Sequence, residues 1–163
     1  LPDGSGKGDG NGFKLGGDGI AVAHILRNSI SYSNGMSGIT SNSNPALILE
    51  NVTSFGNGSS NIALYGKGSG SPRLFKATGV LSIEGTSSDN IREMPELLTD
   101  STYFCNGSNG VNKSGSTLKA EDAFVSTDAK SIIPGRKADG SIDMKTLLEL
   151  TSKVPSNIGA NLK

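Results

Sequence analysis

The sequence predicts an all-β solenoid, a parallel β-helix whose coils stack on one another. Three observations lead to this fold class. Residues 24–39 and 47–62 match at a constant offset of 23, short Val/Ile/Leu-rich runs alternate with Asn-Gly turns, and neither copy contains an amphipathic helix. A period in the low twenties with short strands and polar turns is typical of a β solenoid. The Leu-x-x-Leu-x-Leu frame of a leucine-rich repeat is absent.

The two copies of the repeat agree in polar as well as apolar positions. The aligned pairs include Asn28 with Asn51, Asn34 with Asn57, Tyr32 with Phe55 and Ile39 with Ile62. We expect Asn28 and Asn51 to form a ladder at a turn, each amide bonding to its equivalent in the next coil. A looser third copy begins at Arg73, and there Ala77 is predicted to take the asparagine place.

The first strand is predicted at residues 12–15. Phe13 falls in the row of Ile39 and Ile62, so Lys14 shares its row with Thr40 and Ala63. Because neighbouring side chains of a strand point to opposite faces, Lys14 points away from the core if Phe13 points inward. The sequence therefore places Lys14 on the outer face of a solenoid sheet, where a binding groove would lie.

The repeat fades after residue 85. We expect residues 1–85 to form the coils and residues 86–163 to form a cap and packing arm of the same domain, because a bare last coil would expose apolar surface. Within the arm we predict a loop and helical turn at 89–98, mostly loop at 100–140 with a short strand at 123–125, and a helix at 143–150 capped by Asp143.

Bulk properties exclude several classes of protein. Fifteen basic and fifteen acidic residues balance, so no global field favours a nucleic acid or an anionic membrane as partner. No segment is long and apolar enough to cross a bilayer, and the first residues do not read as a signal peptide. The single cysteine, Cys105, excludes an internal disulfide and is interpreted as a small buried apolar residue.

The densest local motif is the glycine-rich run around Lys14. It is not a Walker phosphate loop, because Phe13 separates Gly12 from Lys14 and no helix follows. It is not an EF-hand loop either, since the terminal glutamate is missing.

In a β-helix, this run has a closer parallel. Asp9-Gly-Asn-Gly-Phe-Lys14-Leu-Gly-Gly17, followed by His24 and by Arg27-Asn28, resembles polysaccharide lyase family nine, the pectate lyases and their relatives. The match continues through Asn34-Gly35, Gly38 and the Asn42-x-Asn44 turn, and it extends to residues 136–141, where the family has a similar element near its C-terminus. The resemblance implies a right-handed parallel β-helix in which Lys14 is the Brønsted base of a β-elimination. It also implies Ca²⁺ as the Lewis acid that holds the uronate carboxylate.

The metal site departs from the family pattern. The calcium aspartates of the family lie in an Asp-Asp-Gly-x-Asp-like cluster upstream of the lysine motif, and this chain starts 13 residues before Lys14 without such a cluster. Asp9 is the one candidate ligand, with a turn residue before Gly10 as the competing interpretation, and Asp18 is interpreted as a turn residue. We therefore expect the chain to be the C-terminal portion of a longer enzyme and, taken alone, an incomplete and inactive fragment.

Two other residues lie near the motif in sequence, Arg27 and His24. Arg27 aligns with Glu50; it is either a solvent-facing coil residue or a substrate-binding group, since arginine pairs well with a carboxylate. His24, the single histidine, is interpreted as structural. At Thr40-Ser41 the family often carries more polar or acidic groups, which leaves the details of the substrate open.

The resemblance leads to one main functional hypothesis and three alternatives. The main one is a secreted, monomeric pectate lyase that cleaves an acidic plant cell-wall polysaccharide with the help of Ca²⁺. The alternatives are a rhamnogalacturonan lyase of the same family, a non-catalytic β-helix for carbohydrate binding or adhesion, and a glycoside hydrolase. The last needs paired carboxylates, and the groove-side strand positions supply none.

Overall fold

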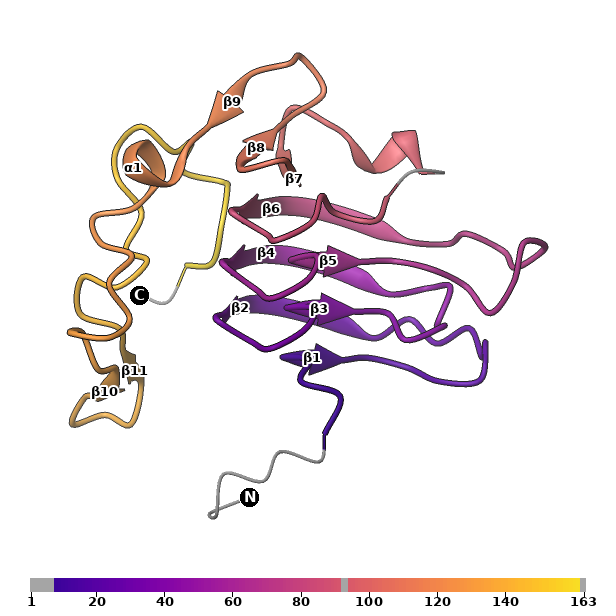
Figure 1. Cartoon of the computed structure of the whole chain (residues 1–163), viewed down its shortest axis with the longest axis horizontal. Coiled ribbons are helices and arrows are strands. Elements are labelled where there is room, and N and C mark those ends of the chain that lie inside the picture. Colours follow the sequence, from indigo (N-terminus) through magenta and orange to yellow (C-terminus); the bar gives the residue numbers. More distant parts are fainter. Residues whose placement is uncertain (1–7, 92–93, 162–163) are drawn as a thin grey trace.

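The computed structural model describes residues 8–91 and 94–161, and its core is a stack of parallel coils (Figure 1). One sheet contains three short parallel strands, β1 (Phe13–Lys14), β3 (Ile39–Thr40) and β5 (Ile62–Ala63). The second sheet contains the long strands β2 (Ile25–Tyr32), β4 (Ile48–Phe55) and β6 (Lys76–Ile83). Strands from successive coils therefore pair side by side, which confirms the predicted parallel β-helix.

The register between the first two coils agrees with the repeat. Ile25 pairs with Ile48 and Tyr32 with Phe55, at the offset of 23 read from the sequence. The third coil differs, because Ile48 pairs with Lys76 and the offset grows to 28. Ala77 consequently pairs with Leu49, and the prediction that Ala77 takes the asparagine place is wrong. The longer connection between β5 and β6 shifts the register by five residues.

Each long strand changes direction at one residue with a left-handed backbone. Asn28, Asn51 and Gly79 have φ of 46°, 51° and 61°. Asparagine and glycine are the residues that adopt this conformation most readily, and here it interrupts otherwise extended backbone. Conformation thus explains the aligned asparagines, and Gly79 is the residue that takes their place in the third coil.

The asparagine ladder exists, but not where we predicted it. Asn51 Nδ2 donates to the carbonyl of Asn157 at 3.5 Å. The ladder instead runs from Asn34 Nδ2 to Asn57 Oδ1 (2.8 Å), from Asn57 Nδ2 to Asn61 Oδ1 (2.7 Å), and from Asn61 Nδ2 to the carbonyl of Ile83 (2.7 Å). It lies in the turns between the two sheets, where buried backbone groups need partners.

The second sheet continues past the repeat. β7 (Thr102–Asn106) pairs in parallel with β6, and β8 (Asn109–Val111) and β9 (Thr117–Leu118) follow as antiparallel strands. Residues 100–140 are otherwise mostly loop, as expected, but the sequence did not predict these three strands. These segments are strands because they extend an existing sheet edge, a tertiary effect that local composition does not reveal.

The rest of the arm contains little regular structure. A 3₁₀ helix, η1 (Pro95–Leu97), confirms the predicted helical turn, although residues 92–93 lie outside the described part of the chain. The short helix α1 (Ala120–Ala123) ends where the predicted strand at 123–125 would begin; within that segment, Phe124 forms an isolated bridge with Leu150. In the part of the chain that the structure describes, no helix is long and apolar enough to span a membrane.

The helix predicted at 143–150 is wrong. Asp143 ends β11 (Ile142–Asp143), which forms an antiparallel hairpin with β10 (Gly135–Arg136) across the 136–141 motif. The Asp143 carboxylate accepts the backbone N–H of Lys145 at 3.0 Å, which is a turn contact rather than a helix cap. Leu147 and Leu148 are buried in the following turns, so packing against the coils overrides their helix propensity.

Two apolar clusters hold the molecule together. The first fills the coils and includes Leu47, Leu49 and Ile62, none of which is exposed. The second joins the arm to the carboxyl ends of the long strands (Figure 1), where the Phe55 and Phe124 rings meet edge to face at 5.3 Å. The arm therefore packs against one side of the solenoid.

Candidate functional site

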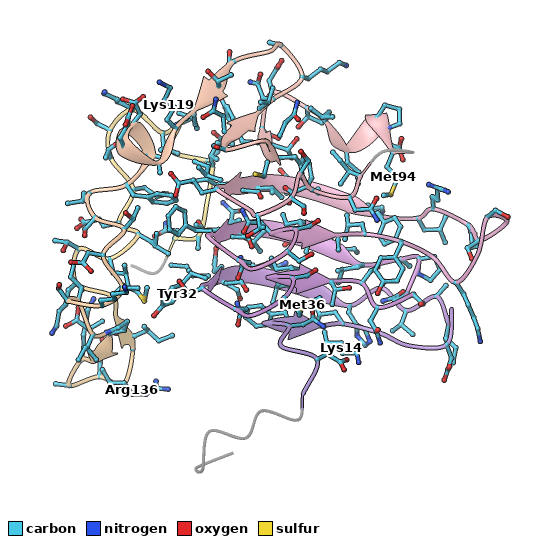
Figure 2. All side chains as sticks on the ribbon, viewed as in Figure 1. Lys14, Tyr32, Met36, Met94, Lys119 and Arg136 are labelled. Carbon is cyan, nitrogen blue, oxygen red and sulfur yellow. The ribbon has the colours of Figure 1, made fainter. Side chains whose placement is uncertain are left out.

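Lys14 lies on the outer face of the first sheet. Its neighbour Phe13 packs against the core, while 46% of the Lys14 side chain is exposed. Lys14 pairs with Thr40, Thr40 with Ala63, and Ala63 with Asn90, so these residues form one outward row across successive coils. Figure 2 shows Lys14 at the end of the stack formed by β1. The predicted orientation of Lys14 is confirmed.

The glycines around Lys14 allow close contact with the next coil. A Cβ at Gly12 would lie 2.4 Å from Ser31 Oγ and 2.6 Å from the carbonyl of Gly38. Gly16 has a φ of 155°, and a Cβ there would lie 2.3 Å from Asn44 Cβ. The glycines of the motif therefore have a packing role: they let the Lys14 strand lie against its neighbour without a steric clash.

Two side-chain amides hold the backbone that follows Lys14. Asn44 Nδ2 donates to the carbonyl of Leu15 at 3.2 Å, and Asn42 Nδ2 donates to the carbonyl of Gly16 at 2.7 Å. Both amides come from the turn after β3, the Asn42-x-Asn44 motif of the sequence. This turn of the next coil thus fixes the strand on which Lys14 stands.

Lys14 forms an ion pair with Asp9. The hydrogen bond and the charge of Asp9 raise the pKa of Lys14, and the same contact lowers the pKa of Asp9. The pair favours the ammonium form of Lys14, which carries no lone pair for proton abstraction. Lys14 can act as a base only after this contact is broken.

The described residues do not form a cation site around Lys14. Among residues 8–91 and 94–161, no group of three or more His, Cys, Asp or Glu side chains is arranged to hold a metal. Asp9 is engaged by Lys14, and Asp18 is an exposed turn residue with a φ of 53°. A hard cation such as Ca²⁺ needs six to eight oxygen ligands, which this arrangement does not supply.

The other sequence candidates lie apart from Lys14. Arg27 is on β2 in the second sheet, where its Nε donates to Glu50 Oε2 at 2.6 Å on the neighbouring strand. His24 lies just before β2, and its carbonyl accepts the N–H of Ile48 at 2.9 Å. The structure therefore does not bring Arg27 or His24 onto the sheet that carries Lys14.

Sequence reasoning missed two residues near the Lys14 row. Tyr65 follows β5, and its phenol oxygen lies 3.4 Å from Thr40 Oγ1. Asn90 ends the row through its bridge to Ala63. Asn90 could not be aligned because the repeat has drifted there, and Tyr65 lies in a connection outside the matched segments.

A buried carboxyl, Asp89, was also missed. Its two oxygens accept the backbone N–H groups of Ile62 and Cys105, both at 2.7 Å. Burial raises the pKa of Asp89 to about 7, against the opposing effect of Ser82 and of these two N–H groups. Asp89 joins the coil that contains β5 to strand β7, and its role is structural.

Comparisons with known proteins give several matches to this chain. It is 42% identical to pectate lyase L of Thermoclostridium stercorarium, over 96% of this chain and 11% of that protein. It is also 42% identical to pectate lyase L of Paenibacillus polymyxa (strain SC2), over 93% of this chain and 33% of that one. Pectate lyase PEL9 of Emericella nidulans is 31% identical over 84% of the chain. No family model matches.

A solved structure has the same fold. The crystal structure of pectate lyase Pel9A superposes with a TM-score of 0.63 at 24% identity, over 96% of this chain and 38% of that one. This match confirms the right-handed parallel β-helix. The chain spans a third or less of the first two curated relatives, so it corresponds to one part of those proteins.

Proposed function

We propose that this chain, which belongs to polysaccharide lyase family nine, supplies the proton-abstracting base of an enzyme that cleaves galacturonate-containing pectic chains by β-elimination. The observation that carries the proposal is the position of Lys14. It is exposed on the outer face of a sheet, in a strand that two amides of the next coil hold in place. Relatives that are 42% identical over nearly the whole chain are named pectate lyases.

The proposed reaction is a balanced elimination. The neutral Lys14 amine takes the proton on carbon 5, alpha to the carboxylate of a galacturonate unit. The electron pair of that C–H bond forms the double bond between carbons 4 and 5. The bond from carbon 4 to the glycosidic oxygen breaks, and this oxygen takes a proton from water as the new chain end; Lys14 then returns its proton to the hydroxide that is left. A lysine in this role needs a pKa close to the working pH, since the base must be unprotonated before it reacts.

Asp9 opposes this role in the structure described here. The ion pair keeps Lys14 charged, so we infer that Asp9 moves away from Lys14 before the proton is taken. Both partners are exposed, Lys14 by 46% and Asp9 by 61% of their side chains. Water screens the charges of such exposed pairs strongly, so little free energy is needed to separate them.

Calcium enters the proposal only as the family resemblance implies it. The described residues do not form a site for it, and the part assigned here to the chain is proton abstraction. We further propose that the substrate is an acidic plant cell-wall polysaccharide, that the protein acts as a monomer and that it is secreted.

The experiment that tests the proposal compares Lys14→Ala with the unaltered protein. The intact protein that carries this chain is incubated with polygalacturonate and Ca²⁺, and the unsaturated product is followed by its ultraviolet absorbance. We expect the substitution to lower the rate by about 10²–10⁴-fold, the usual contribution of a general base. Lys119→Ala is the matched control: Lys119 is also exposed, but lies on the arm far from Lys14 (Figure 2). An unchanged rate for Lys14→Ala would show that Lys14 is not the base.

A further inference from the structure

The ring of Tyr65 lies on the same outer face as Lys14. Its phenol contacts Thr40, which is the direct partner of Lys14 in the outward row. Tyr65 also contributes, after Asp9, to the raised pKa of Lys14. The side chain is nevertheless 39% exposed, which leaves part of the ring open to a ligand.

The backbone of Tyr65 is held independently of its ring. Its N–H donates to Ser41 Oγ at 2.9 Å, and Ser41 Oγ donates to the Tyr65 carbonyl at 2.8 Å. Ser41 itself is fully buried. The ring is therefore presented on a rigid support, and a change of the side chain leaves these two hydrogen bonds in place.

A hollow of about 270 Å³ lies next to Tyr65, farther along the stack from Lys14. Tyr65, Arg73, Phe75, Asn90 and Met94 line it, together with residues of the connection after β5. Asn90 stands in the Lys14 row, three coils on. An aromatic ring and apolar floor with a few polar groups are typical of a small-ligand site, and a guanidinium group suits a carboxylate.

The spacing of the coils relates the hollow to Lys14. Adjacent parallel strands are about 4.8 Å apart, so the β5 coil lies roughly 10 Å along the stack from the β1 coil. A disaccharide covers a similar length. A pectic chain that lies along the outward row with one unit at Lys14 would therefore bring another unit to Tyr65 and the hollow.

We propose that Tyr65 and this hollow form a subsite for an acidic sugar unit of the same chain, about two coils along from the bond broken at Lys14. The inference rests on the proposed function, because the direction of the substrate is taken from the position of Lys14. Tyr65 stacks on the apolar face of the sugar, Asn90 meets its hydroxyl groups, and Arg73 faces its carboxylate. Tyr65 is a binding residue and takes no part in proton transfer.

The test separates binding from cleavage by using Lys14→Ala as the background. Affinity of the intact Lys14→Ala protein for hexagalacturonate is measured by titration calorimetry, with and without Tyr65→Ala. We expect Tyr65→Ala to weaken binding about tenfold, a loss typical of truncating an aromatic contact residue, and Tyr65→Phe to change it less. Leu74→Ala is the matched control, because Leu74 is exposed beside the hollow and does not line it. Equal affinity with and without Tyr65→Ala would overturn the subsite.

Kinetics on the otherwise unaltered protein give a second readout. Tyr65→Ala should raise KM for polygalacturonate with little change in kcat, since a remote subsite contributes uniform binding. Arg73→Gln should reduce the preference for polygalacturonate over its methyl ester. A fall in kcat with unchanged KM would contradict the binding role of Tyr65. If Lys14→Ala retains full activity while Tyr65→Ala still weakens hexagalacturonate binding, the proposed base fails and the subsite stands.

Discussion

Asp89→Asn is the substitution that most directly tests how the solenoid is held together beside the candidate site. In the folded protein both carboxyl oxygens of Asp89 accept a backbone N–H at 2.7 Å, from Ile62 and from Cys105. In asparagine an NH2 group replaces one of these two oxygens. One backbone N–H then keeps its acceptor, and the other faces a second donor. The loss of one buried hydrogen bond costs about 1–3 kcal/mol, so the variant should be less stable than the unaltered protein at pH 4.

The pH dependence of this difference follows from the pKa of Asp89. Burial raises it from 3.8 to about 7, so between these values the folded state holds a proton that the unfolded state has released. The contribution of Asp89 to the free energy of unfolding is therefore fully present below pH 4, and it decreases as the pH rises toward 7. An interval of about three pH units corresponds to about 4 kcal/mol. The advantage of the unaltered protein over Asp89→Asn should fall by about that amount between pH 4 and pH 8.

The measurement is urea unfolding followed by far-ultraviolet circular dichroism at several pH values. Asp128→Asn serves as a control, because Asp128 is an exposed aspartate whose pKa is lowered by hydrogen bonds from Ser131. Asp128→Asn should change the pH dependence of the free energy of unfolding only slightly, and in the direction opposite to that of Asp89→Asn. If the advantage over Asp89→Asn grows as the pH rises from 4 to 7, the two N–H groups outweigh burial and the reasoning is refuted.

Three further predictions concern the site and the core. Asp9→Asn should move the acid limb of kcat/KM to lower pH, because Asp9 raises the pKa of Lys14 and only the neutral amine is active; an unmoved limb in a pH-rate series would contradict this. Asn57→Ala should lower the free energy of unfolding by about 3 kcal/mol in urea titrations, because it leaves the buried partners of the ladder unpaired. A loss as small as that of a surface substitution would show that water replaces the amide. Leu49→Ala should cost about 2–5 kcal/mol by the same method, because Leu49 is fully buried in the coil core and leaves a cavity. A cost below 1 kcal/mol would indicate that the coils collapse around the gap.

The coil architecture was predictable because a solenoid repeats in sequence what it repeats in space. The offset of 23 gave the pairing of β2 with β4, and the alternation of Phe13 and Lys14 placed the lysine on the outer face. The ladder was only half predictable. The aligned asparagines were visible, but Asn28 and Asn51 turned out to be bends, and the hydrogen-bonded amides are Asn34, Asn57 and Asn61.

Where the repeat stops, local sequence patterns were a poor guide. The segment 143–150 has helix-compatible spacing, yet Lys145 and Leu148 adopt left-handed conformations and Leu147 is buried against the coils. Strands β7 to β9 form because the sheet presents an edge to them, although their own composition indicates loop. Packing against an existing surface decides such segments, and no window of sequence contains that surface.

By itself the sequence determined the coil, the row of Lys14 and the glycines that flank it, because the periodicity of a strand and the register of a repeat are local properties. Only the tertiary structure decided what surrounds Lys14. Asp9 folds back onto it from five residues earlier, Tyr65 reaches its row from two coils away, and Arg27 lies on another sheet. The positions of Tyr65 and Arg27 depend on how the connections between strands cross the stack, and the contact of Asp9 depends on how the chain bends before β1. Charge pairing and contact over such distances arise only when the coils are assembled.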